Sequence, residues 1–130
     1  MIVGKSYKKL KVWGKADDFA VSVYEVTRQF PKEEFFGITS QLRRASLSVP
    51  LNIVEGHARQ GKAELKQFLR IALASLSEVE YLLEFCSKLG YFSIEEYSVI
   101  EKKREEVGKM LWGFYKAQFT TANTDNKKTS

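Results

Sequence analysis

The chain has 130 residues, 44% of them apolar, and a net charge of +5. A chain of this length forms one domain with its own core, and no apolar run reaches the roughly 18 residues of a membrane span. The N-terminus has no signal-peptide core, and the single cysteine, Cys86, excludes an intramolecular disulfide. These features predict a soluble, cytoplasmic protein that does not enter a membrane.

The first helix is predicted over about 12–29. Apolar residues recur three and four positions apart from Val12 to Val26, which indicates one buried stripe. Phe30 and Pro31 end it, because the residue before a proline is pushed out of the helical region.

The second helix is predicted over about 32–58, with Pro31 at its first turn. Pro50 lies inside its apolar pattern, and the pattern keeps its phase across the proline. This favours a kinked helix, and the alternative is a break at Ser48-Val49. The residues that repeat at three and four positions are Phe35, Ile38, Leu42, Ala45, Val49, Asn52 and Gly56.

The third helix is predicted over about 62–89, between Gly61 and a C-terminal cap at Gly90. Its apolar residues keep a four-three spacing over three heptads, which is typical of a bundle seam. A second apolar stripe lies beside the seam, so a monomer would leave apolar surface unburied. The seam consists of Leu65, Leu69, Ala72, Leu76, Val79, Leu83 and Cys86.

The fourth helix is predicted over about 93–118, because Ser93 and Glu96 form a capping box. The polar tail 121–130 has no core face and is expected to be disordered. Four amphipathic helices with short connections predict an all-α fold, an antiparallel up-down four-helix bundle over residues 1–120 with a proline kink in its second helix.

Charge is unevenly distributed along the chain. Residues 1–15 carry five lysines and no acid, and residues 28–70 are also mainly basic, whereas acids predominate in residues 71–106. This distribution suits an anionic partner, and it equally suits attraction between the two halves or between subunits.

The sequence offers little for catalysis, so we expect a protein that is not an enzyme, with no catalytic residue, metal or cofactor. His57 is the only histidine and has no glutamate three residues before it, as a di-iron bundle would require. It is expected to cap a helix or face solvent. Cys86 lies on the apolar seam near Glu80 and Glu84, where a reactive thiolate is disfavoured.

Polar residues of the second helix form one line beside its apolar seam. One interpretation is a half-buried network that fixes helix register or a subunit contact. The other is a groove for a ligand or phosphate, with arginines as donors. The line consists of Gln41, Arg44, Ser48, Asn52, Glu55 and Arg59.

A set of basic residues on the second and third helices suggests a surface for RNA or DNA phosphates, with no sequence readout and strong salt dependence. The alternative is a solvated helix face. The candidate residues are Arg43, Arg44, Arg59, Lys62, Lys66 and Arg70.

Several motifs in this order resemble one bacterial family over about residues 10–114. They are LKVW at 10–13 with Ala16, FPKEE at 30–34, QLRRA at 41–45, SVP at 48–50, NI at 52–53, EG at 55–56 with Arg59, and the block from Phe68 to Glu80. The chain thus resembles the 23S ribosomal RNA intervening-sequence proteins, also labelled S23 ribosomal proteins. It departs from them locally, for instance in Val54, His57, Gly61 and Ala74.

The resemblance implies a four-helix bundle that assembles as a ring-like homo-oligomer, a homopentamer, with distant kinship to retroelement accessory proteins that work with nucleic acid. It implies no activity. The leading hypothesis is a non-enzymatic homo-oligomeric bundle that contacts RNA or DNA through its basic residues. The alternative is a protein-interaction scaffold without a nucleic-acid role.

Overall fold

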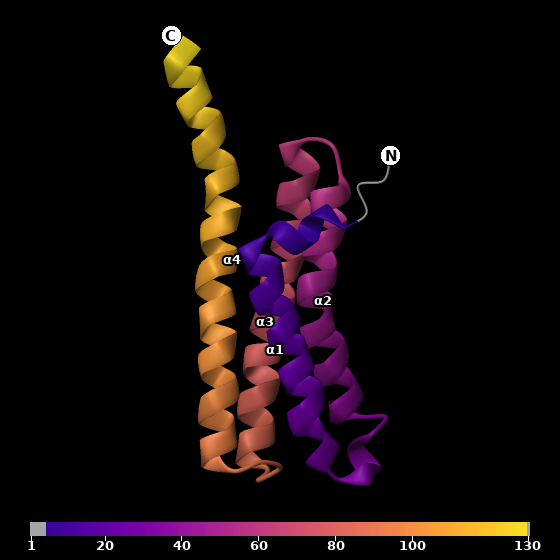
Figure 1. Ribbon diagram of the computed structural model, residues 1–130. Coiled ribbons are helices and arrows are strands. Elements are labelled where there is room, and N and C mark those ends of the chain that lie inside the picture. The colour runs from indigo at the N-terminus through magenta and orange to yellow at the C-terminus, as the bar shows by residue number, and fades with distance from the viewer. Residues whose placement is uncertain (1–4, 130) are drawn as a thin grey trace.

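A computed structural model of the chain describes the backbone of residues 5–129 and the side chains of residues 5–119. The described residues form α1 (Lys11–Val26), α2 (Ile38–Ala58), α3 (Lys62–Lys88) and α4 (Ile94–Thr129), with no strand among them. The connections between successive helices lie at alternating ends of the molecule (Figure 1). The prediction of an all-α fold with four helices is confirmed.

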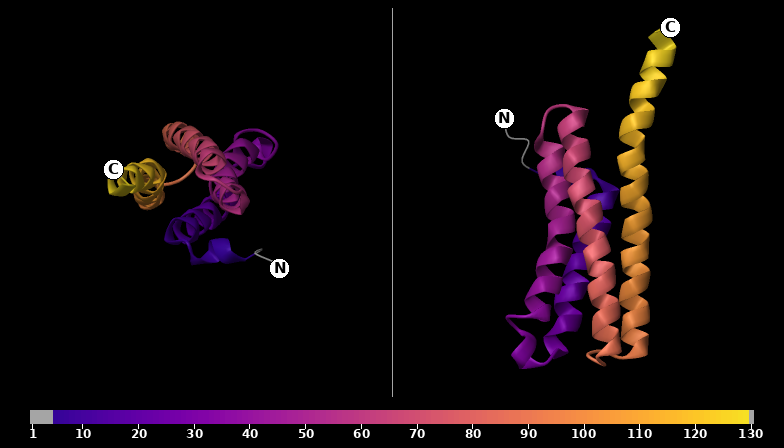
Figure 2. Two further views of the ribbon diagram at one scale, coloured as in Figure 1. Left: turned by 90° about the horizontal axis from the view of Figure 1, so that it is seen from above. Right: turned by 180° about the vertical axis from the view of Figure 1, so that it is seen from behind.

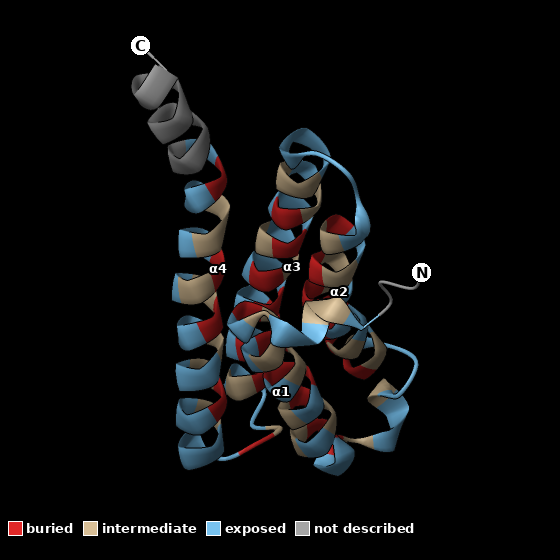
Figure 3. Ribbon diagram, turned by 45° about the horizontal axis from the view of Figure 1, so that its top comes forward, coloured by how far each residue is buried: buried red, intermediate tan, exposed pale blue. Residues whose placement is uncertain are grey.

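The four helices enclose the core (Figure 2), and the buried residues of each helix lie on the side that faces the others (Figure 3). α2 packs against α1 and α3, and α4 packs against the same two helices. The seam predicted for the third helix is buried from Leu69 onward. The largest fully buried apolar side chains are Phe19, Leu42, Ile53, Leu69, Leu83 and Leu111.

α2 passes through Pro50 without interruption, so the alternative of a break at Ser48-Val49 is wrong. The proline is itself buried, and Val49 and Ile53 on either side of it are fully buried. Burial of this apolar face compensates for the backbone hydrogen bond that proline deletes. The bend expected at Pro50 stays a prediction.

The start of the second helix differs from the predicted one. Residues 32–34 form a short 3₁₀ helix, η3 (Lys32–Glu34), and α2 begins only at Ile38. Phe35, expected in the apolar seam, is 51% exposed. Gly37 breaks the helical backbone with φ −112° and ψ −118°, and the backbone N–H of Ile38 donates to Glu34 Oε1 at 3.4 Å. Glu34 lies outside the helix, and its carboxylate thus accepts a hydrogen bond from a backbone N–H group in the first turn of α2 that has no partner within the helix.

The predicted boundaries of the first and third helices hold more closely. α1 ends at Val26, and residues up to Gln29 continue as the 3₁₀ helix η2 (Thr27–Gln29). Gly61 and Gly90 have φ of 96° and 74°, which a residue with a side chain rarely adopts.

The capping box at the start of α4 is confirmed. The backbone N–H of Glu96 donates to Ser93 Oγ at 3.0 Å, and that of Ser93 donates to Glu96 Oε1 at 2.8 Å. This hydrogen bond to the backbone of Ser93 lowers the pKa of the Glu96 carboxyl. The backbone of α4 is assigned beyond the expected end at Gln118. The expected disorder of 121–130 lies outside the described side chains and stays a prediction.

Within the part of the chain that the structure describes, none of the helices combines the length and the apolar character needed to span a membrane.

Substitution of Gly56 by alanine should destabilise the fold. A Cβ at this position would lie 3.0 Å from both Leu65 Cδ1 and Phe68 Cβ, and Phe68 Cβ cannot move without the α3 backbone. We expect Gly56→Ala to lower the free energy of unfolding by about 1–2 kcal/mol in urea denaturation.

The matched control is Gly14→Ala, where a Cβ would meet nothing within 4 Å. Because alanine favours the helix, that variant should gain about 0.5–1 kcal/mol. Equal effects of the two substitutions would contradict a close helix approach at Gly56.

Candidate functional site

The middle of the polar line joins α2 to α3. The side-chain amide of Asn52 donates to the backbone oxygen of Ser48 at 2.7 Å and to Ser48 Oγ at 2.9 Å. Ser48 Oγ lies 2.9 Å from Ser75 Oγ on α3, and either hydroxyl can donate. These half-buried groups satisfy one another and hold the two helices in register.

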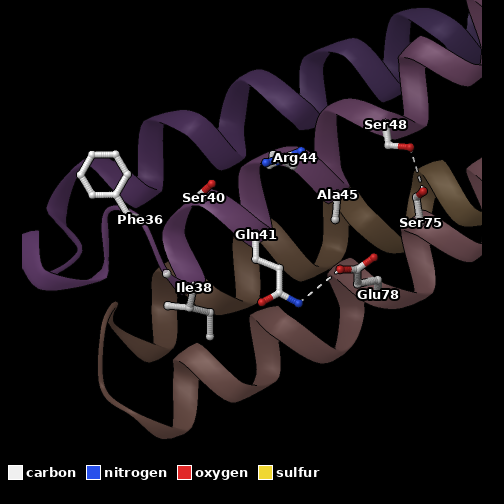
Figure 4. A pocket seen from close by; sticks show the side chains of 10 residues that line it. Phe36, Ile38, Ser40, Gln41, Arg44, Ala45, Ser48, Ser75 and Glu78 are labelled. Carbon is white, nitrogen blue, oxygen red and sulfur yellow. Dashed lines mark hydrogen bonds between the residues drawn. The ribbon is translucent and has the colours of Figure 1, made fainter.

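The line opens into a shallow groove at the beginning of α2. This cavity of about 600 Å³ lies between α2 and α3 and is lined by Arg44, Gln41 and Glu78, among others. Gln41 Nε2 donates to Glu78 Oε2 at 3.4 Å across its floor (Figure 4). Arg44 is exposed, and within the described residues its guanidinium forms no ion pair.

The other end of the line is a surface ion pair. Arg59 Nη2 lies 3.2 Å from Glu55 Oε1, and both side chains are about half exposed. The Arg59 guanidinium also lies 5.0 Å from the centre of the Phe68 ring. Exposed pairs of this kind contribute little to stability, and Arg59 and Glu55 together add no net charge here.

The six predicted basic residues do not form one face. Arg43 turns toward α1, where its Nε donates to Thr27 Oγ1 at 2.8 Å and its Nη2 donates to the backbone oxygen of Tyr24 at 3.3 Å. Arg44 points to the groove beside α3. Successive helical residues are about 100° apart, so neighbours in sequence face different elements. Arg44 and Arg59 are separated by about 22 Å along α2.

The remaining four gather where α2 meets α3. Lys62 and Arg70 are exposed, while Lys66 Nζ lies 4.1 Å from the centre of the Phe119 ring on α4. Arg59 and Lys62 flank the α2–α3 connection, which lies at one end of the bundle (Figure 1), and Lys66 and Arg70 follow along α3, Arg70 about 12 Å beyond Lys62.

The N-terminal segment brings further lysines to this end. The sequence shows that these lysines are clustered, but it does not show where they lie in the fold. Ser6 Oγ lies 3.0 Å from His57 Nε2, and the Tyr7 ring packs edge-on against Trp13 at 4.9 Å. These contacts hold the 3₁₀ helix η1 (Ser6–Lys9) beside the end of α2. His57, expected to cap a helix or face solvent, therefore anchors the N-terminal segment.

We call this end of the bundle the basic end. Its exposed acids are Glu55, already paired with Arg59, and Glu64 in the first turn of α3. Its cationic residues are Lys5, Lys8, Lys9, Arg59, Lys62, Lys66 and Arg70.

The model of the 23S rRNA-intervening sequence protein family matches residues 8–113. The chain belongs to this family. The matched region spans α1, α2, α3, the first part of α4, the groove beside Arg44 and the basic end apart from Lys5, so the resemblance seen in the sequence motifs is confirmed.

A solved structure with the same fold comes from the S23 ribosomal protein family of Bacteroides thetaiotaomicron and is described as a protein of unknown function. It is 30% identical to this chain, with a TM-score of 0.75, and the match covers 81% of this chain and 95% of that one. A search of the curated proteins gives no match.

Cys86 of this 23S rRNA-intervening sequence protein lies in the core and not at either candidate site. Burial raises the pKa of the Cys86 thiol to about 11, and the charge of Glu34 adds to the rise. The described residues contain no group of three or more His, Cys, Asp or Glu side chains placed to hold a metal ion.

Cys86 should therefore react slowly with thiol reagents. A pKa near 11 leaves about 100-fold less thiolate at pH 8 than an ordinary cysteine has. With DTNB at pH 8, we expect the folded protein to react at least about 100-fold more slowly than the same protein in 6 M guanidinium chloride. Similar rates in both states would show that the thiol is accessible and ionised in the fold.

Proposed function

We propose that the protein is a non-enzymatic, homo-oligomeric bundle that binds nucleic-acid phosphates through the basic end. The observation that supports this proposal is the Ser6–His57 contact. It places lysines of the N-terminus beside the cations of the α2–α3 connection, although about 50 residues separate them in the chain.

The chemistry of the basic end suits a polyanion. Lysines with little nearby acid attract phosphates through long-range electrostatics and release counterions on binding. Within the described residues, Lys62 and Arg70 carry no ion pair that would neutralise them. Phosphate contacts of this kind do not read base sequence. The family's name, 23S rRNA-intervening sequence protein, makes structured RNA the first ligand to test, with duplex DNA beside it.

Self-association is supported by apolar side chains left exposed on the outer sides of α2 and α3. Leu51 is 53% exposed and Tyr81 is 62% exposed, and Leu47, Ile71 and Phe85 are exposed in the same way. Apolar surface of this kind is typical of a contact between copies. We propose a ring-like homopentamer built through these helices, as the resemblance implies.

The finer features of the subunit belong to the same proposal. Connections at alternating ends support the antiparallel up-down order of the helices (Figure 1), and Pro50 inside α2 supports a bend there. The cytoplasm is the compartment we propose.

A protein-interaction scaffold is the second candidate, and the groove beside Arg44 favours it. Arg44, Gln41 and Glu78 line an open cavity of about 600 Å³ next to exposed apolar side chains. Arginine is one of the residue types that most often carry the binding energy of a protein contact when the contact buries them.

The basic end should determine affinity for duplex DNA and structured RNA. We expect Lys8→Gln combined with Lys9→Gln and Lys62→Gln to lower the affinity measured by filter binding at least tenfold at low salt. The same variant should reduce the slope of log K against log[salt] by about 0.9 per lost phosphate contact. Lys102→Gln with Lys103→Gln and Lys109→Gln, which removes three exposed lysines of α4, is the charge control. Failure of the unmodified protein to retain either ligand, or retention insensitive to salt, would reject the proposal.

The assembly is tested by mass. Light scattering should give a mass of five times the 14.9 kDa of one chain. If the scaffold hypothesis is correct, Arg44→Ala lowers this mass while duplex affinity is unchanged. An unchanged mass counts against a subunit contact at Arg44, and a monomeric unmodified protein rejects the oligomer.

A further inference from the structure

Two neighbouring phenylalanines are exposed at the end of the bundle opposite the basic end. Phe35 and Phe36 lie in the turn between η3 and α2, and they are 51% and 91% exposed. Their rings are in edge-on contact, with centroids 4.9 Å apart and an interplanar angle of 82°. The Phe36 ring lines the edge of the groove beside Arg44 and lies apart from the other labelled side chains (Figure 4). A nearly fully exposed phenylalanine offers an aromatic face to a ligand.

A cavity of about 380 Å³ beside this pair is lined by Arg28, Lys32 and Arg43 and by no acidic residue. Each of the four other cavities described on the molecule has at least one carboxylate in its wall. This charge distinguishes the cavity beside the phenylalanines as a place for an anion. We call Arg28, Lys32, Phe35, Phe36 and Arg43 the Phe36 corner.

The cations of the Phe36 corner are available to a ligand. Arg43 is held by its bonds to Thr27 and Tyr24 and by its position 4.9 Å from the centre of the Tyr24 ring. These bonds use two of the five N–H donors of a guanidinium. Arg28 and Lys32 are exposed, and neither forms an ion pair within the described residues. A fixed arginine beside two exposed cations is preorganised for a phosphate.

The nearby acids do not line this cavity. The Glu34 carboxylate accepts hydrogen bonds from the Tyr91 hydroxyl at 2.7 Å and from the Ile38 backbone instead. Glu33 is exposed and does not line the cavity. Thr39 lines the cavity from α2, and its buried hydroxyl has no hydrogen-bond partner within the described residues. Rotation about its Cα–Cβ bond would offer this hydroxyl to a ligand.

Phe36 also lines the groove that contains Arg44. A ring placed on Phe36 therefore lies beside the cavity whose charged residues are all cations, namely Arg28, Lys32 and Arg43. A nucleotide has a matching form, since each base is joined through its sugar to a phosphate. Aromatic stacking combined with backbone cations is how proteins hold single strands without reading their sequence.

We infer that the Phe36 corner binds a nucleotide unit of single-stranded nucleic acid, with a base on Phe36 and a phosphate among Arg28, Lys32 and Arg43. The class of ligand rests on the proposed nucleic-acid role, whereas the location of the site does not. A duplex keeps its bases stacked inside, so it gains nothing from Phe36.

The stacking contact is tested with a single-stranded oligonucleotide that contains 2-aminopurine, whose fluorescence reports stacking. Phe36→Ala should weaken single-strand binding about tenfold and remove the fluorescence change, while Phe36→Tyr retains both. Ile94→Ala, which shortens an apolar side chain that is 80% exposed, is the matched control and should have no effect. Equal affinity and fluorescence for the unmodified protein and Phe36→Ala would overturn the inference.

The phosphate contact is tested by salt dependence. Arg28→Gln with Lys32→Gln should reduce the single-strand slope of log K against log[salt] by about 0.7 per lost contact. Duplex affinity should stay within twofold, because the basic end is untouched. If the slope of log K against log[salt] for single strands is unchanged, the Phe36 corner does not contact a phosphate.

The same variants separate this inference from the proposed function. Lys8→Gln with Lys9→Gln and Lys62→Gln should weaken duplex binding and leave the 2-aminopurine response intact. If the unmodified protein does not bind duplex but shows a single-strand response that depends on Phe36, only the proposal for the basic end is rejected. If it binds duplex but its single-strand response does not depend on Phe36, only the inference for the Phe36 corner is rejected.

Two other occupants are distinguished directly. Binding to phosphatidylserine vesicles that requires Phe36, without single-strand binding, would make the corner a membrane contact and overturn the inference. A lower mass of Phe36→Ala in light scattering, with single-strand affinity unchanged, would make it a subunit contact and overturn it as well. An unchanged mass and no vesicle binding are the expected results.

Discussion

The close approach of α2 to α3 is the constraint on which the rest of the molecule depends. Gly56 has no side chain at the point where Leu65 and Phe68 lie against α2, and a Cβ there would be 3.0 Å from each. About two turns earlier, Asn52, Ser48 and Ser75 satisfy one another across the same contact. Shape at one point and hydrogen bonding at the other define one register for the helix pair. That register determines which side chains of α2 face α1, α3 and solvent.

The distribution of charge follows from this packing and from two local arrangements. The Ser6–His57 contact keeps the lysines of the N-terminus beside the α2–α3 connection. Arg104 on α4 is different, because only 12% of its side chain is exposed and it pairs with Glu101 and Glu80. The hydrogen bond to Glu101 raises the pKa of its guanidinium. Positive charge is therefore neutralised where α3 meets α4 and remains exposed at the basic end.

Periodicity in the sequence was enough to locate four helices, because each buries one apolar stripe. It was not enough to locate the start of α2, since Phe35 lies three residues before Ile38 and fits the same repeat. Only Gly37 and the carboxylate of Glu34 mark the break, and the role of Glu34 depends on its bond to Tyr91, 57 residues away. The basic end could not be assembled from sequence for the same reason: the Ser6–His57 contact joins residues 51 positions apart. Arg43 and Arg44 look like one motif, yet the helix turns them to different neighbours.

The two ends of the bundle differ in how far the faces of their aromatic rings are exposed to a ligand. At the basic end, Arg59 lies over Phe68 and Lys66 lies over Phe119, so cations of the protein already cover faces of these rings. Such an end can offer charge to a phosphate backbone but little aromatic surface to a base. At the Phe36 corner, Arg43 is engaged with Tyr24, and the Phe36 ring remains almost wholly exposed. Charge alone suits any polyanion, whereas charge beside an uncovered ring favours a strand whose bases are not already stacked. The cations at the two ends thus differ in ligand preference because of the rings they lie against.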